Sequence, residues 1–206
     1  MKKLYVLVAC EESQTSCIAF RNLGCIAFSC DLQPCTGGHP EWHIHGDVSP
    51  LISNSPCTIT CQDGSTHFVP KWDLLLAHPP CTYLSCAYSR KLSDARIKLL
   101  KEAASFFMSL YNSSIEYVCV ENPRPFRLAA LPHPTCVVSP HMFGSRYSKR
   151  TYLWTRNLPP VIPTCFNPHP ISFTATRSGS KARSKSDPLM YKEIARQFVE
   201  FILNDY

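Results

Sequence analysis

Four short, almost uninterrupted apolar runs constrain the fold of this chain more than any other feature of its sequence. Runs of this length without regular polar alternation are typical of strands buried on both faces, as in parallel sheets. Segments with helical features stand among these runs, and the alternation predicts an α/β fold with a doubly wound, mostly parallel sheet. The four runs are Leu4–Ala9, Cys25–Cys30, Trp72–Ala77 and Tyr117–Val120.

Cap and turn residues define the remaining elements. Ser13 is expected to cap a helix over Ser13–Leu23, and the dipeptide Asp63-Gly64 indicates a β-hairpin inserted into the sheet. The other expected elements are a loop over Gln33–Gly46, hairpin strands over Cys57–Thr60 and Thr66–Val69, a helix over Ser93–Tyr111, a strand over Thr151–Trp154, a loop over Asn157–Pro188 and an amphipathic helix with its core over Ala195–Leu203.

The length of 206 residues fits a single domain. Residues 1–156 are expected to form its core, residues 157–186 a basic loop rich in proline and serine, and residues 187–206 a closing helix. No apolar stretch approaches the roughly 20 residues of a membrane-spanning helix, so no membrane partner is expected. Several of the twelve cysteines lie in apolar runs, where free thiols act as small core residues; this favours a reduced, cytoplasmic protein over a secreted disulfide framework.

Charge is unevenly distributed along the chain. The net charge is +6, and the stretch from Asn122 to Asp187 holds ten Lys or Arg residues and one acid, Asp187 itself. Such an asymmetry suits a surface that meets a polyanion. A solvated face without a partner is the alternative.

Side chains capable of chemistry follow each of the four apolar runs. Cys10 and Glu11 follow the first run and Asp31 follows the second. Cys81 lies just beyond the third run, and Glu121 follows the fourth. Open parallel sheets bind their ligands outside the carboxyl ends of the strands, so these five residues are expected to share one site.

Two of these positions stand in motifs that resemble those of the DNA cytosine-C5 methyltransferases. The segment Ala77-His-Pro-Pro-Cys81 resembles the family's Pro-Cys nucleophile loop, and Glu121-Asn-Pro123 resembles its Glu-Asn-Val segment. The resemblance implies that Cys81 adds as a thiolate to C6 of a cytosine flipped out of DNA, while Glu121 acts as the acid at N3. It also implies that S-adenosylmethionine is the methyl donor.

The resemblance extends to the donor site and to a basic segment. Asp31 stands where the family has an acid near the ribose hydroxyls, and Asp47 where it has an acid near the adenine amino group. Lys149 and Arg150 resemble the segment that holds the cytosine carbonyl or a phosphate, and Lys149 is preferred as the catalytic member. The loop after the first run lacks the family's glycine-rich sequence. The expected donor site comprises Cys10, Glu11, Asp31, Asp47 and Pro79.

More closely, the pattern resembles small phage-encoded proteins of this family, for example over Gln33–Ile44. That resemblance implies a place in the host cytoplasm. Residues 157–186 occupy the position of the family's target-recognition domain and are expected to contact phosphates rather than to read bases. Either sequence specificity is weak or a protein partner supplies it. The expected nucleic-acid contacts are Arg146, Arg150, Arg177, Lys181, Arg183 and Lys185.

Other interpretations stay open at this point. The same chemistry could act on RNA or a free nucleotide, or the chain could be an inactive relict that binds nucleic acid or blocks restriction. His78 is expected to pack or hydrogen-bond locally rather than to tune the thiolate. A zinc site is the alternative for one cluster, but its spacing lacks a Cys-x-x-Cys pair and no metal is expected. That cluster comprises Cys30, Cys35, His39, His43 and His45.

Overall fold

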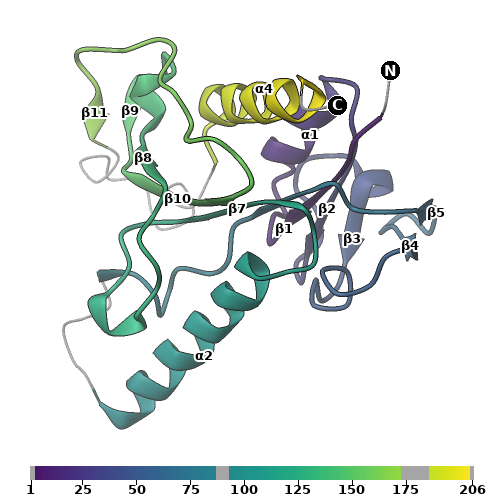
Figure 1. The fold of residues 1–206 in the computed structure, drawn as a ribbon, viewed down its shortest axis with the longest axis horizontal. Helices are drawn as coiled ribbons and strands as arrows, with labels where there is room; N and C mark the ends of the chain where they lie inside the picture. The colour runs from purple at the N-terminus through teal and green to yellow at the C-terminus, as the bar shows by residue number, and fades with distance from the viewer. Residues whose placement is uncertain (1–2, 87–92, 173–185, 205–206) are drawn as a thin grey trace.

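The computed structural model describes residues 3–86, 93–172 and 186–204. Within these residues, a central sheet of seven strands carries the fold (Figure 1). Its strands, in spatial order, are β3 (His43–His45), β2 (Ile26–Asp31), β1 (Tyr5–Ala9), β6 (Leu74–Ala77), β7 (Tyr117–Asn122), β10 (Thr151–Arg156) and β8 (Cys136–Val138). The first five run parallel, whereas β10 is antiparallel to both of its neighbours.

Helices cover both faces of this sheet (Figure 1). On one face, α1 (Thr15–Arg21) packs against α4 (Pro188–Asn204). On the other, α2 (Asp94–Tyr111) shares a core with the hairpin of β4 (Cys57–Thr60) and β5 (Thr66–Val69). The expected α/β class, with a doubly wound, mostly parallel sheet and an inserted hairpin, is confirmed.

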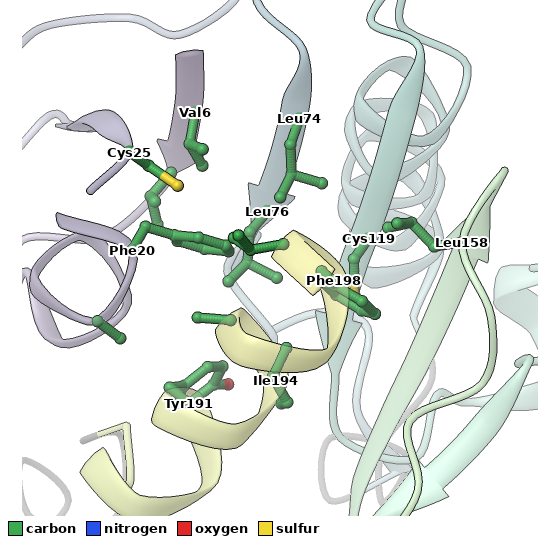
Figure 2. Close-up of a cluster of buried hydrophobic side chains, with 14 of the residues drawn as sticks. Val6, Phe20, Cys25, Leu74, Leu76, Cys119, Leu158, Tyr191, Ile194 and Phe198 are labelled. Atoms are coloured by element: carbon green, nitrogen blue, oxygen red, sulfur yellow. The ribbon is translucent and has the colours of Figure 1, made fainter. Parts of the chain in front are cut away.

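Figure 2 shows how the first face is filled. Phe20 of α1 and Ile194 and Phe198 of α4 are fully buried against the sheet, where Val6 and Leu76 supply the opposing surface. Burying a side chain of this size contributes about 1.5–3 kcal/mol. Because α4 covers β1, β6 and β7 together, it is an integral part of the core.

The strand order reverses at β1. From β1 the chain moves outward to β2 and β3, then returns to the other side of β1 for β6 and β7. The loops that follow β1 and β6 therefore leave in different directions, and a crevice opens between them at the carboxyl ends of the strands. Ligands of such sheets bind at this kind of reversal.

The antiparallel strand β10 brings its beginning, not its end, to this same edge. Leu153 pairs with Glu121, and Tyr152 pairs with Asn122. The turn that precedes β10 therefore lies beside the carboxyl end of β7, and it carries Lys149 there.

Several short elements were not predicted from the sequence. The expected loop Gln33–Gly46 contains β3, which extends the sheet beyond β2, and β8 forms the opposite edge. A two-residue strand also occurs within the expected loop Asn157–Pro188. The remaining short elements are η1 (Pro40–Trp42), η3 (Arg127–Ala129), η4 (Pro140–Met142), β9 (Tyr147–Ser148) and β11 (Ile171–Ser172), which pairs with β9.

The beginning of α1 corrects one expectation. Ser13 does not cap α1: Gln14 occupies the N-cap position, and its side chain makes no capping bond. α4 spans Pro188–Asn204 and contains the predicted helical core Ala195–Leu203. None of the helices within the described ranges is long and apolar enough to cross a membrane. All twelve cysteines are free thiols.

Candidate active site

A pocket of about 520 Å³ lies at the carboxyl ends of β1, β6 and β7. Cys81, Glu121 and Lys149 line it together, although they come from three distant parts of the sequence. The predicted donor residues Cys10, Glu11 and Pro79 also lie in its wall, together with His78, Ser186 and Tyr191. We call this the cysteine pocket.

A second pocket of about 290 Å³ adjoins the first. Cys10 and Pro80 line both pockets, so the two spaces meet at these residues. Asp31 and Asp47, the two predicted acids of the donor site, line the second pocket. We call this the aspartate pocket.

Asn122 holds the loop that carries Cys81. Its side-chain amide donates a hydrogen bond to the carbonyl of Pro79 at 3.0 Å, and Asn122 is fully buried. Beyond Pro79, the carbonyl of Cys81 accepts the backbone N–H groups of Leu84 and Ser85, which begins a tight turn. Leu84 anchors this turn because it is fully buried. Cys81 itself is an exposed residue that lines the pocket.

His78 connects Glu121 to the first helix. Its Nδ1 atom lies 3.3 Å from Oε2 of Glu121, and its Nε2 atom lies 3.2 Å from Oγ of Ser16 at the beginning of α1. The imidazole packs edge-on against the ring of Tyr191 from α4, with centroids 5.1 Å apart. Both members of the His78–Glu121 pair are almost completely buried.

The groups in the pocket shift the pKa values of Glu121 and Cys81 in opposite directions. Burial acts to raise the pKa of Glu121, but the hydrogen bond and charge of His78 and the charge of Lys149 outweigh it, so the pKa is lowered. The pKa of the Cys81 thiol is raised, first by desolvation in the pocket wall and then by the negative charge of Glu121. The ammonium of Lys149 acts in the opposite direction on the thiol. Lys149 therefore favours both the carboxylate and the thiolate.

The loop after β1 adopts glycine-like backbone geometry without glycine. Cys10 has a φ of 59° and Gln14 a φ of 57°, both in the left-handed region. Each such non-glycine residue costs roughly 1–2 kcal/mol. The amide of Cys10 is fixed by the carbonyl of Cys30 at 2.7 Å. Gly37 packs onto this loop so closely that a Cβ atom there would lie 2.6 Å from the backbone oxygen of Ser13.

Glu11 has a structural task within this loop. Its two carboxylate oxygens accept the backbone N–H groups of Ser16 at 2.7 Å and Cys17 at 3.1 Å. Glu11 thus caps α1 from four residues before the helix begins, which replaces the cap expected from Ser13. A carboxylate at a helix N-terminus is also stabilised by the positive end of the helix dipole.

The aspartate pocket combines apolar walls with two carboxylates. Val48 and Phe106 contribute to the walls. Asp31 uses one oxygen to accept the N–H of Gln33 at 2.8 Å, and Asp47 likewise accepts the N–H of Ser49 at 2.9 Å. Each carboxylate is therefore held by its own turn.

The predicted nucleic-acid contacts do not all gather at the cysteine pocket. The exposed guanidinium of Arg146 lies over the ring of Tyr147 at 4.9 Å from its centroid, outside the residues that line the pocket. Arg150 lines a different, neighbouring pocket. The other four predicted contacts lie outside the described residues. They are Arg177, Lys181, Arg183 and Lys185.

The cluster considered for zinc does not converge. The ring nitrogens of His43 lie 2.9 Å from Oγ of Ser29 and 2.9 Å from the carbonyl of Gln33. His39 stacks on Trp42 instead. Among the residues that the structure describes, no group of three or more His, Cys, Asp or Glu side chains is placed to hold a metal ion.

Sequence reasoning missed three contributors to the site. His78 was expected to interact locally, but its main partner is Glu121, 43 positions away. Asn122 was noted only as part of a motif, although its amide positions the loop of Cys81. Tyr191 had no sequence signal, because only the packing of α4 brings it to the pocket.

Comparisons with known proteins give a limited picture. No protein-family model and no curated protein sequence matches the chain. One similar solved structure is assigned as a DNA modification methyltransferase encoded within an E. coli prophage, with a TM-score of 0.47 and 14% identity over 81% of this chain and 52% of that chain. Another is the Dnmt2 methyltransferase of S. pombe, with a TM-score of 0.41 and 16% identity over 89% of this chain and 59% of that chain. The chain thus spans little more than half the length of these proteins, and the functional argument below rests on its own site.

Proposed function

We propose that this protein transfers a methyl group from S-adenosylmethionine to C5 of cytosine in DNA, through a covalent bond between Cys81 and C6 of the base. One observation carries the proposal: Cys81, Glu121 and Lys149 line one pocket, and that pocket adjoins a second one lined by Asp31 and Asp47. A nucleophile, an acid and a cation beside a separate donor pocket are the parts that this reaction needs.

Cys81 performs the first step. Its thiolate adds to C6 of the cytosine, and the electron pair of the C5–C6 bond moves toward N3, where Glu121 supplies a proton or hydrogen bond. C5 would then form a bond to the methyl carbon while the bond from that carbon to the donor sulfur breaks, and the electron pair of the broken bond would leave with the demethylated donor. After solvent water accepts the proton from C5, the Cys81–C6 bond breaks and the thiolate leaves.

The aspartate pocket fits the donor by its chemistry. When bound, S-adenosylmethionine supplies an electrophilic methyl group on a positively charged sulfur. The carboxylates of Asp31 and Asp47 can accept hydrogen bonds from hydroxyl and amino groups, and the apolar walls suit a flat ring. The left-handed Cys10 allows the backbone to turn sharply between the two pockets. That geometry takes the place of the glycine-rich loop missing from the sequence.

His78 supplies the proton that Glu121 lacks. The lowered pKa of Glu121 means that this carboxyl is ionised at neutral pH and carries no proton of its own. The Nδ1 atom of His78, 3.3 Å from Oε2, is placed to pass a proton to Glu121 as the carboxyl protonates N3. The proton returns along the same path when the Cys81–C6 bond breaks. His78 thereby acts on the reaction through Glu121.

Intact-mass analysis with 5-fluorocytosine substrates tests the proposal, because fluorine at C5 prevents the final proton loss and traps the adduct. Wild-type protein with donor is expected to gain the mass of one DNA oligonucleotide plus one methyl group. Cys81→Ser is expected to form no adduct, whereas Cys165→Ser, which changes an exposed thiol elsewhere, should react normally.

The substrate arms separate the alternatives. An adduct that forms only with RNA, or only with the free nucleotide, would reassign the substrate. No adduct in any arm, together with no calorimetric binding of the donor at millimolar concentration, would indicate the relict that binds nucleic acid. Methylation of duplex DNA without sequence preference would support a separate protein partner as the source of specificity.

A further inference from the structure

A third pocket, of about 470 Å³, shares Lys149 with the cysteine pocket. We call it the flanking pocket. Residues of β8, of η4 and of the turn between β9 and β10 line it, including Val137, His141, Met142, Ser148, Lys149 and Arg150. Lys149 lines both this pocket and the cysteine pocket, so a molecule in one contacts the same side chain as a molecule in the other.

The backbone at Lys149 is held in place. The N–H of Lys149 donates to Oγ of Ser139 at 3.0 Å, and the same oxygen lies 2.9 Å from Nδ1 of His141. Ser139 is buried at the beginning of η4. The wall between the two pockets is therefore fixed by hydrogen bonds rather than by a free loop.

The chemistry of the flanking pocket suits a nucleotide. Val137 and Met142 give it an apolar surface, while Lys149 and Arg150 place two cations at it. Among the residues that the structure describes, no acidic side chain lines it. Beside it, Phe166 is 63% exposed and stands edge-on to the ring of His141, with centroids 5.0 Å apart. Apolar surfaces, aromatic rings and cations together are what proteins use to hold unstacked bases and their phosphates.

We propose that the flanking pocket binds the nucleotide next to the target cytosine on a single strand of DNA, with the intervening phosphate at Lys149. This inference rests on the proposed function and deepens it, because it makes the substrate a DNA strand rather than a free nucleotide. Base and phosphate are recognised by contact with the strand itself, without reading a sequence.

Calorimetric titration of the wild-type protein with dCMP and with the trinucleotide d(TpCpT) tests the inference. The trinucleotide is expected to bind at least about tenfold more tightly, with a salt dependence steeper by about 0.7 for each additional phosphate contact. Equal affinities, or no binding of either ligand, would overturn the proposal. An equal or larger gain with r(UpCpU) would overturn the assignment to DNA.

Two variants test whether the flanking pocket is the source of the tighter binding of the trinucleotide. Arg150→Ala removes a cation and Val137→Asp places a negative charge on the apolar surface; Val137 is 41% exposed, so the change is compatible with folding. Each should reduce the gain from the flanking nucleotides to about threefold or less and leave the affinity for dCMP within about twofold of wild type. Lys98→Ala, an exposed lysine on α2, should retain the full gain. An undiminished gain in both pocket variants would place the contact elsewhere.

Two measurements keep this inference separate from the proposed function. If the length-dependent gain and its loss in Arg150→Ala occur without any methyl transfer, the pocket stands and the methylation proposal fails. If cytosine is methylated but the trinucleotide gains nothing, the reverse holds. Sedimentation of wild type and Val137→Asp tests the competing occupant: a wild-type dimer that this change converts to a monomer would show that a second copy fills the pocket and would overturn the proposal.

Discussion

Nδ1 of His78 and Oε2 of Glu121 lie 3.3 Å apart, and both side chains are almost completely buried. This pair joins the end of β6 to the end of β7. Lys149 and Tyr191 face it from the turn before β10 and from α4, and Glu11 faces it from the loop after β1. The pKa of Glu121 is lowered by His78 and Lys149, so its ionisation state depends on residues from two distant parts of the chain.

Replacing His78 tests this dependence directly. His78→Phe removes the hydrogen bond and charge that lower the pKa of Glu121 but keeps a ring against Tyr191, so burial should dominate and the carboxyl pKa should rise above its usual value. Carbon-13 NMR of labelled glutamate side chains measures the titration. His67→Phe, the same exchange on β5 outside the residues that line the pocket, is the control and should change it little. An unaltered Glu121 pKa in His78→Phe would show that the pair does not form in solution.

Lys149 is expected to assist the thiolate of Cys81. Lys149→Met keeps the length of the side chain and removes its charge, so the already raised pKa of Cys81 should rise further. At neutral pH the alkylation of Cys81 by iodoacetamide, followed by peptide mass spectrometry, should become several-fold slower. Arg150→Met, one residue away, should leave the rate near wild type. Equal rates in the two variants would contradict the assignment of Lys149.

Glu11 should contribute to stability through its cap on α1. Glu11→Gln retains the shape but loses the charge and one of two acceptor oxygens, which leaves a buried N–H without its partner. The free energy of unfolding should fall by about 1–2 kcal/mol, measured by urea denaturation. Glu12→Gln, at the neighbouring and less buried position, should change it by less than about 0.5 kcal/mol. A loss of equal size in both variants would argue for a general charge effect.

Asp47 and Asp63 offer a matched comparison for the donor site. Each uses Oδ1 to accept both the N–H and the hydroxyl of the serine two residues later, but only Asp47 lines the aspartate pocket. Asp47→Asn should weaken binding of S-adenosylmethionine about tenfold to a hundredfold, since a hydrogen bond to a charged group is worth about 1.5–3 kcal/mol. Asp31→Asn should act similarly. If calorimetry shows that Asp63→Asn weakens donor binding as much as Asp47→Asn does, Asp47 is not part of the donor site.

The sequence predicted the parts of the fold that depend on local pattern. The buried runs that became β1, β2, β6 and β7 were recognisable because a strand covered on both faces must be apolar throughout. By contrast, β3 consists of three residues, and its pairing of His43 with Ser29 depends on the position of β2. The edge strand β8 was missed for the same reason. Neither strand carries enough residues to show a period.

The candidate site likewise contains residues that a local sequence pattern predicted and residues that it did not. Cys81 and Glu121 were found because each follows a strand in a recognisable motif, and the structure places them in one pocket. The cap on α1 was assigned to Ser13 because that residue type is favoured beside a helix. The carboxylate of Glu11 reaches the helix instead, since two left-handed residues fold the loop back on itself. Such a turn has no signal in the sequence when glycine is absent.

The packing of α4 on α1 has a consequence for how the protein is made. The two helices are separated by most of the sequence, yet they cover the same face of β1, β6 and β7. After β7 has been synthesised and before α4 follows, α1 is the only one of these two helices that can cover that apolar face. A nascent chain that stalls before Pro188 would expose Phe20 and Leu76 to other chains, and exposed apolar surface of this kind leads to aggregation. Such an incomplete chain would therefore need a chaperone to keep it from aggregating.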